Sequence, residues 1–173
     1  ICREMIDRKI TGIELTCNAR ADVDYETLSL MRTAGFRMMC VGFESGDQET
    51  LNRMRKGTEA RRISGFVRDA RAAKVKIHGC FMYGNREETA ETMHRTLDFA
   101  LALPIDTAQF YPIMLSPGTA DYEYYKKAGR LITEDFSKWN DERGQHRSTV
   151  RREYLTEKEI EDFCDFSRRR FYL

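Results

Sequence analysis

The sequence predicts an α/β fold made of parallel strand–helix units. Four short apolar runs begin near residues 13, 38, 76 and 107, and a segment with helical spacing follows each of them. Strands that alternate with helices are typical of a parallel sheet whose connections all cross over with the same hand. Because four units make half of an eight-unit barrel, we expect either an open sheet or the later part of a TIM-like partial barrel, with a C-terminal helix.

The composition fits one globular domain or part of a larger one. The chain has 173 residues, 41% of them hydrophobic, and its 29 basic and 28 acidic residues nearly cancel. This balance argues against nucleic acid as a partner, and no apolar run is long enough for a membrane span. The five cysteines are widely spaced in sequence, which predicts a reducing, cytoplasmic setting, thiols buried as small hydrophobes, and no zinc or iron–sulfur motif.

The first segments predict a helix, a strand and a second helix. Residues 1–10 have helical spacing but no capping residue, which indicates that the polypeptide continues upstream in nature. The run 12–18 alternates between apolar and polar residues, as a half-buried strand does. Asp24 can then cap a helix that ends at Gly35.

The second unit is a buried strand followed by two helices. The run 38–43 is almost continuously apolar, which is typical of a strand covered on both faces. Asp47 can cap a helix that ends near Gly57. Thr58 is the expected cap of the next helix, whose residues 63, 66, 67 and 70 form one apolar stripe.

The third and fourth units follow the same order. The run 75–84 predicts a strand, and the next helix begins after Thr89 and ends before Pro104. The run 107–115 predicts the fourth strand, and an aromatic-rich helix continues to Gly129.

The remaining residues predict a different kind of structure. We divide the chain into four parallel units over 1–131, and a connector with a C-terminal helix over 132–173. The segment Thr156–Glu159 is a capping box that starts this helix, and Arg168–Arg170 would complement its dipole at the other end.

Ligands of parallel α/β folds bind beyond the carboxyl ends of the strands, so polar residues at those ends form the candidate site. They are Asn18, Arg20, Glu44, Ser45, His78, Tyr83, Gly84, Gln109, Tyr111 and Ser116. Because the four strand ends should share one mouth, we expect these residues to gather there.

Several of these residues have both a functional and a structural interpretation. Glu44 and Ser45 could accept hydrogen bonds from a ribose diol, or they could pair with an arginine and cap a helix. Arg20 could hold a substrate carboxylate or pair with Asp22. His78 could act as a general base, although a lone histidine in a strand is more often structural.

One stretch of sequence resembles a known family. The run 41–51, VGFESGDQETL, followed by Lys56-Gly57-Thr58, is similar to the fourth-strand signature of radical S-adenosylmethionine (radical SAM) enzymes. The similarity is greatest to the subgroup with an N-terminal cobalamin-binding domain, which includes magnesium-protoporphyrin IX monomethyl ester oxidative cyclases. Further motifs occur in the expected order at Asn18–Asp22, His78-Gly79, Glu88-Thr89 and Ser116–Thr119. The resemblance covers roughly residues 1–140.

The resemblance also implies roles for individual residues. The implied contacts to S-adenosylmethionine are Asn18, Arg20, Glu44, Ser45, Met82, Gly84, Glu87, Gln109 and Tyr111. Among them, Glu44 and Ser45 would touch the ribose, and Met82 would lie under the adenine. The implied contacts to a substrate are His78, Pro117 and Gly118.

The resemblance implies a parent enzyme that uses S-adenosylmethionine, a [4Fe–4S] cluster and, through an upstream domain, cobalamin. The parent would be an oxidoreductase or transferase acting on a small molecule such as a tetrapyrrole or a lipid. This chain lacks the CxxxCxxC motif that ligates the cluster, and has GNREET at 84–89 where the family usually has GxPGET. We therefore expect the chain to hold cofactor and substrate but to be inactive alone.

Two alternatives remain open. An ordinary (β/α)8 enzyme such as an aldolase would need a lysine or paired carboxylates at strand ends and a late glycine-rich phosphate loop, and we find neither. A degenerate, non-catalytic half-barrel would serve as a scaffold or oligomerisation module. Half a barrel exposes strand edges, so we expect self-association in either case.

Overall fold

A computed structural model describes all residues 1–173 and contains one four-stranded parallel sheet. The strands, in spatial and chain order, are β1 (Leu15–Ala19), β2 (Phe36–Glu44), β3 (Lys76–Tyr83) and β4 (Thr107–Pro112). The predicted α/β fold of parallel strand–helix units is therefore confirmed. None of the helices combines the length and the apolar character that crossing a membrane requires.

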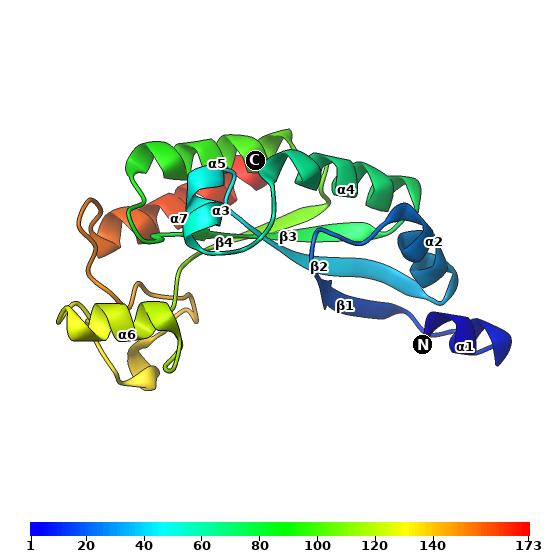
Figure 1. The fold of residues 1–173 in the computed structure, drawn as a ribbon, viewed down its shortest axis with the longest axis horizontal. Helices are drawn as coiled ribbons and strands as arrows, with labels where there is room; N and C mark the ends of the chain where they lie inside the picture. Colours follow the sequence, from blue (N-terminus) through cyan, green and yellow to red (C-terminus); the bar gives the residue numbers. More distant parts are fainter.

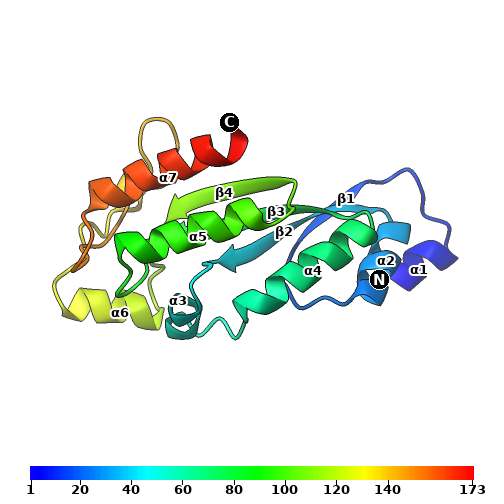
Figure 2. The ribbon, with the colours of Figure 1, turned by 90° about the horizontal axis from the view of Figure 1, so that it is seen from above.

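Four of the seven helices cover one face of this sheet. The bounds of the helices are α1 (Cys2–Asp7), α2 (Tyr25–Thr33), α3 (Gln48–Arg53), α4 (Ala60–Ala72), α5 (Ala90–Ala102), α6 (Ala120–Lys127) and α7 (Glu157–Tyr172). Figures 1 and 2 show α2, α4, α5 and α7 side by side over the sheet, and α6 beyond the carboxyl end of β4. We call the uncovered side of the sheet the open face.

The core lies between the sheet and this helical layer. Phe43, Phe81 and Phe110, from three neighbouring strands, are fully buried and lie ring against ring, with centroids 5.7 and 5.3 Å apart. Apolar residues of α4, α5 and α7 complete one cluster of 22 buried residues. Since α7 shares this core, the C-terminal helix is part of the same packed unit as the four strands.

Local capping signals account for most helix starts. Asp24 accepts the backbone N–H of Thr27 at 2.7 Å, and Asp47 accepts that of Thr50 at 2.9 Å. Thr156 begins α7 with the predicted capping box.

The cap predicted for α4 is wrong. Its N-cap is Glu59, without a side-chain bond, in place of Thr58. Gln48 of α3 supplies the missing acceptor, because its Oε1 accepts the N–H of Ala60 at 3.0 Å. The same amide also donates to the carbonyl of Thr58.

The C-terminal helix closes the outer edge of β4. The Tyr172 hydroxyl accepts from the N–H of Ala108 at 2.9 Å and donates to the carbonyl of Ala108 at 2.7 Å. Arg168 donates to the carbonyl of Phe110 at 2.6 Å, while Arg169 and Arg170 lie in the last turn of the helix, as expected. β4 also ends at Pro112, before the predicted Leu115, because its partner β3 ends at Tyr83.

The connector between α6 and α7 is irregular, as its polar sequence predicts. It contains a single 3-10 turn, Phe136–Lys138, and two isolated bridges, Leu131 to Val150 and Asn140 to His146. The rings of Phe136 and Trp139 pack edge to face with centroids 4.8 Å apart. This segment lies at the carboxyl ends of the strands (Figure 1).

Candidate functional site

The open face carries polar and sulfur-containing side chains on every strand. Alternate residues of each strand point to it, because successive side chains of a strand lie on opposite faces. They are Thr16 and Asn18 of β1, Met38, Cys40, Gly42 and Glu44 of β2, His78, Cys80 and Met82 of β3, and Thr107, Gln109 and Tyr111 of β4. Parallel sheets are normally covered on both faces, so a polar face of this kind is the candidate site.

Glu44 is the most unusual residue of this face. It is a non-glycine residue with φ of +69°, at a point where the register of β2 against β3 shifts. The bend folds its carboxylate back over Gly42, where any Cβ would collide with Oε1. A residue held in this backbone region is typical of functional sites, since the strain must be compensated by surrounding contacts.

The carboxylate of Glu44 is half satisfied. Only 8% of the residue is exposed, and Oε1 accepts a hydrogen bond from Lys56 Nζ at 2.6 Å. The other oxygen, Oε2, is buried and has no hydrogen-bond partner. A buried oxygen of this kind is costly unless a ligand or water supplies a donor.

Ser45 lies on the helix side of the turn. It is fully buried; its hydroxyl is 2.9 Å from that of Thr96 on α5 and accepts the N–H of Asp47 at 3.1 Å. These bonds fix the turn that presents Glu44. A contact between Ser45 and a cofactor stays a prediction.

The residues at the end of β1 are exposed. Asn18 points to the open face, and Arg20 pairs with Asp22 at 3.0 Å. Arg20 also donates to the carbonyl of Lys56 at 3.2 Å, which ties this end of β1 to the residue that holds Glu44. The structure thus adopts the ion pair that the sequence offered for Arg20, and its contact with a ligand remains a prediction.

The middle of the open face holds two thiols and an imidazole. Cys40 Sγ and Cys80 Sγ are 3.4 Å apart, and His78 Nδ1 is 2.8 Å from Thr107 Oγ1. Burial, the neighbouring Cys40 and the charge of Glu44 raise the pKa of Cys80 to about 12. Burial raises the pKa of Tyr111 in the same way. Without a cation, both groups stay protonated at neutral pH.

Met82 and Gln109 also face this side. Met82 is half-buried and pairs with Tyr111 across β3 and β4, and Gln109 is exposed opposite Cys80. Tyr111 packs edge to face on His146 of the connector, with ring centroids 5.6 Å apart. This placement is compatible with the predicted contacts of Met82, Gln109 and Tyr111 with the adenine or the substrate, which stay predictions.

The turn after β3 places Gly84 away from the open face. Gly84 has φ of +81°, its N–H donates to Glu88, and a Cβ there would collide with Arg152 and Ile160. Burial raises the pKa of Glu88 to about 7. The backbone of Gly84 is thus enclosed by the chain itself, and its predicted contact with a cofactor stays a prediction.

Three other predicted residues lie at the rim. Glu87 has φ of +60° and its carboxylate is 3.9 Å from Arg53, bordering a cavity of about 260 Å³. Pro117 and Gly118 are exposed in the turn before α6. The structure therefore does not bring them together with Glu44, and their ligand contacts remain predictions.

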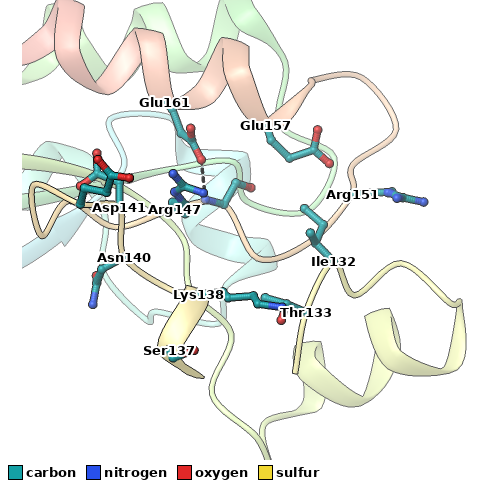
Figure 3. A pocket seen from close by; sticks show the side chains of 12 residues that line it. Ile132, Thr133, Ser137, Lys138, Asn140, Asp141, Arg147, Arg151, Glu157 and Glu161 are labelled. Carbon is teal, nitrogen blue, oxygen red and sulfur yellow. Dashed lines mark hydrogen bonds between the residues drawn. The ribbon is translucent and has the colours of Figure 1, made fainter. Parts of the chain in front are cut away.

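A separate cavity of about 720 Å³ lies between the connector and the start of α7 (Figure 3). It is lined by charged and polar groups and one hydrophobic residue, Ile132, and contains none of the predicted site residues. Glu161, one of the lining residues, accepts the N–H of Ser148 at 3.0 Å. Because none of the predicted cofactor or substrate residues lines it, this cavity is a weaker candidate than the open face.

Sequence reasoning missed three residues of the candidate site. Lys56 was noted only as part of a motif, although it holds Glu44 from twelve residues away. Cys40 and Cys80 were interpreted as separate buried hydrophobes, because their spacing matches no local metal motif. The alternation of side chains along each strand was the available signal, because it places both cysteines on the open face of neighbouring strands.

Curated proteins similar to this chain are methyltransferases. The bacteriochlorophyllide d C-8(2)-methyltransferase of Chlorobaculum tepidum is 30% identical over 119 residues, which are 68% of this chain and 26% of that protein. An uncharacterised methyltransferase of Pyrococcus horikoshii is 29% identical over 128 residues, which are 73% of this chain and 28% of that protein. The chain thus spans about a quarter of the length of the curated relatives it matches.

Solved structures with the same fold carry related descriptions. The radical S-adenosylmethionine methyltransferase TsrM from Kitasatospora setae, with cobalamin and a [4Fe–4S] cluster bound, has a TM-score of 0.66 at 20% identity, over 85% of this chain and 36% of that chain. The cobalamin-dependent S-adenosylmethionine radical enzyme OxsB has a TM-score of 0.53 at 22% identity, over 73% of this chain and 19% of that chain. At these identities the likeness supports the fold alone.

The family is shown by a match to a family model. A family model described as the Radical SAM superfamily matches residues 1–100, more than half of the chain. The match includes the run 41–51, on which the resemblance was based, and three of the four strands. This chain belongs to the Radical SAM superfamily.

Proposed function

We propose that this chain forms the later part of the catalytic barrel of a cobalamin-dependent radical SAM methyltransferase. Family membership supports the use of S-adenosylmethionine. Three curated relatives are methyltransferases, which favours methyl transfer over the oxidative cyclisation that the resemblance suggested. The solved neighbours TsrM and OxsB, which share the fold, are described with cobalamin, and we include that cofactor in the proposal.

The observation that carries this proposal is the unpaired oxygen of Glu44. Lys56 holds Oε1, while Oε2 is buried without a donor at the carboxyl end of β2. A ribose hydroxyl is a donor of the right kind, and a carboxylate accepts such bonds strongly. In our proposal Glu44 therefore binds the ribose of S-adenosylmethionine, which supplies the methyl group and the radical chemistry when bound.

The rest of the open face would receive the adenine and the substrate. Met82 offers an apolar, polarisable surface beside Tyr111, and Gln109 and Asn18 offer amide donors and acceptors. Two of the curated relatives act on bacteriochlorophyllide d, by name. We propose a cyclic tetrapyrrole as the substrate class.

The cluster is a different case, because the chain has no CxxxCxxC motif. The residues present do not fit a [4Fe–4S] cluster, and we assign no step to it in this chain. We propose that its ligands lie in the remainder of the barrel, and that this chain alone binds S-adenosylmethionine without cleaving it.

The test of the cofactor site is a binding measurement on this chain. We expect S-adenosylmethionine to bind in isothermal titration, and Glu44→Gln to weaken binding about 10- to 100-fold, because a hydrogen bond to a charged acceptor is lost. Glu49→Gln, an exposed carboxylate on α3, is the matched control and should leave binding unchanged. Equal binding by both variants would remove Glu44 from the site.

The test of the reaction uses the complete polypeptide that contains this chain, loaded with cluster and cobalamin. We expect a labelled methyl group of S-adenosylmethionine to appear in a bacteriochlorophyllide d product, detected by mass spectrometry. Oxidation of the tetrapyrrole without added label would instead favour the oxidative cyclase. No binding and no turnover would favour the non-catalytic scaffold.

A further inference from the structure

Three metal-ligating side chains meet on the open face. Cys40 of β2 and His78 and Cys80 of β3 offer ligand atoms that all lie within 4.8 Å of one another. The register explains this: Cys40 is directly opposite His78, and Cys80 is two residues further along the same strand, on the same face. The cluster is therefore built by β2 and β3, the two central strands of the sheet.

The distances suit a tetrahedral metal site. The two sulfur atoms are 3.4 Å apart. Zinc–sulfur bonds of about 2.3 Å at a tetrahedral angle require the two sulfur atoms to be about 3.8 Å apart. A side-chain rotation that moves one sulfur atom by a few tenths of an ångström is sufficient. Two thiolates and one imidazole are the ligand types that zinc prefers, and hard cations such as Mg²⁺ disfavour them.

The histidine is oriented by a neighbouring hydroxyl. His78 Nδ1 is 2.8 Å from Thr107 Oγ1 of β4. With Nδ1 as donor, this bond fixes the ring and leaves the lone pair of Nε2 free for a metal ion. Metal-binding histidines usually have such a partner on the other nitrogen.

The Glu44 carboxylate also lies beside the cluster, as a neighbour of Cys80. A bound divalent cation would stabilise the two thiolates directly and attract this carboxylate. The Tyr111 hydroxyl is a further neighbour of Cys80.

We propose that Cys40, His78 and Cys80 bind one zinc ion, with the fourth coordination position open toward the ligand-binding side of the sheet. Three protein ligands with one open position are typical of zinc sites that contact a substrate or an activated water. A thioether, thiolate or imidazole nitrogen of a bound small molecule would be suitable as the fourth ligand. None of the three ligands is among the implied contacts to S-adenosylmethionine, although His78 is an implied contact to the substrate. The zinc site does not depend on the proposed methyl transfer.

The test is zinc binding by the 173-residue chain, purified under reducing conditions and freed of metal. We expect one zinc ion per chain by atomic emission after dialysis. We also expect replacement by Co²⁺ to give thiolate-to-cobalt charge-transfer bands and the intense visible bands of tetrahedral cobalt. Cys40→Ser and Cys80→Ser should each weaken zinc binding at least 100-fold in competition with a chromogenic chelator.

Two sets of variants separate a built site from chance binding. Thr107→Val should weaken binding about 10- to 100-fold, because it releases the ring of His78 without removing a ligand. Cys17→Ser and His94→Gln change a thiol and an imidazole elsewhere and should leave the affinity unchanged. Circular dichroism confirms that each variant keeps the fold before its affinity is compared.

Several results would overturn the proposal. One is the absence of tetrahedral thiolate bands with Co²⁺ in the unsubstituted chain. Another is zinc affinity that falls as much with Cys17→Ser as with Cys40→Ser. A third is a Cys40–Cys80 disulfide that persists in the reduced preparation, which mass spectrometry after thiol alkylation would detect. The spectrum of the unsubstituted chain decides the question even if a ligand variant fails to fold.

Discussion

The two outer edges of the sheet differ in whether their outward-facing backbone groups are hydrogen-bonded within the chain. At β4, Tyr172 and Arg168 of α7 bond the outward-facing backbone groups of Ala108 and Phe110. At β1, the only neighbouring strand is β2. The N–H of Leu15 donates to the carbonyl of Gly35, the residue just before β2, so the alternate residues Thr16 and Asn18 direct their backbone groups outward, where no strand meets them.

The comparison teaches where this sheet can be extended. An edge whose donors and acceptors are already bonded within the chain gives a further strand little to bind, whereas an unpaired edge is a template for pairing. β4 therefore serves as the last strand of its sheet, and β1 is the position where another strand can add. The same reasoning supports the proposal that the rest of the barrel joins at β1.

The largest effect should follow from uncovering β4. Deleting residues 168–173 removes Arg168, Phe171 and Tyr172, and with them three hydrogen bonds to the β4 backbone. We expect the free energy of unfolding to fall by roughly 3–5 kcal/mol in urea titrations. Deleting residues 1–6 is the control, since α1 has no buried residue, and should cost about 1 kcal/mol or less. Equal losses would mean that α7 does not protect the edge.

Removal of the Tyr172 hydroxyl tests the contact between α7 and the edge of β4 more sharply. Tyr172→Phe keeps the ring and removes the hydroxyl that both accepts from and donates to Ala108. We expect a loss of about 1–2 kcal/mol in the free energy of unfolding. Tyr154→Phe, at a tyrosine that is 59% exposed, should change it by less than about 0.5 kcal/mol. If the two variants have the same stability, the edge of β4 is satisfied by water.

The opposite edge should respond in association and hardly in stability. Thr16→Pro removes an outward N–H of β1, a change that edge strands tolerate. We expect a change in unfolding free energy of about 1 kcal/mol or less, and a marked decrease in concentration-dependent self-association by sedimentation velocity. Self-association that persists in this variant would place the contact elsewhere.

The smallest effect is expected at the end of β1. Arg20 and Asp22 form an ion pair whose side chains are 57% and 65% exposed. Arg20→Ala should lower stability by less than about 1 kcal/mol, because exposed ion pairs contribute little. A loss of S-adenosylmethionine binding at unchanged stability would instead confirm the ligand contact implied by the resemblance.

Local signals in the sequence were sufficient for the architecture. Asp24, Asp47 and Thr156 cap helices as expected, because the capping residue and the N–H that it accepts are three residues apart. Contacts between distant segments were not predictable in this way. Gln48 replaces Thr58 as the partner at the start of α4, and this requires two helices to meet in space.

The same limit applies to the candidate site. The position of Glu44 at the end of a strand makes it a candidate from sequence alone. The structure adds that Lys56 holds one carboxylate oxygen and that the other, Oε2, is buried without a donor. Cys40 and Cys80 are 40 residues apart, so no spacing rule could join them. Their proximity depends on strand register, which is decided by the packing of Phe43 and Phe81 on the opposite face.

A sheet with one unpaired edge can add only one partner. Two copies that pair through β1 would be related by a two-fold axis, and the pairing would leave neither copy with an unpaired strand. The resulting dimer would be closed, whereas a fibril requires two unpaired edges on every subunit. By sealing β4, Tyr172 and Arg168 would thus guard the isolated chain against amyloid-like polymerisation.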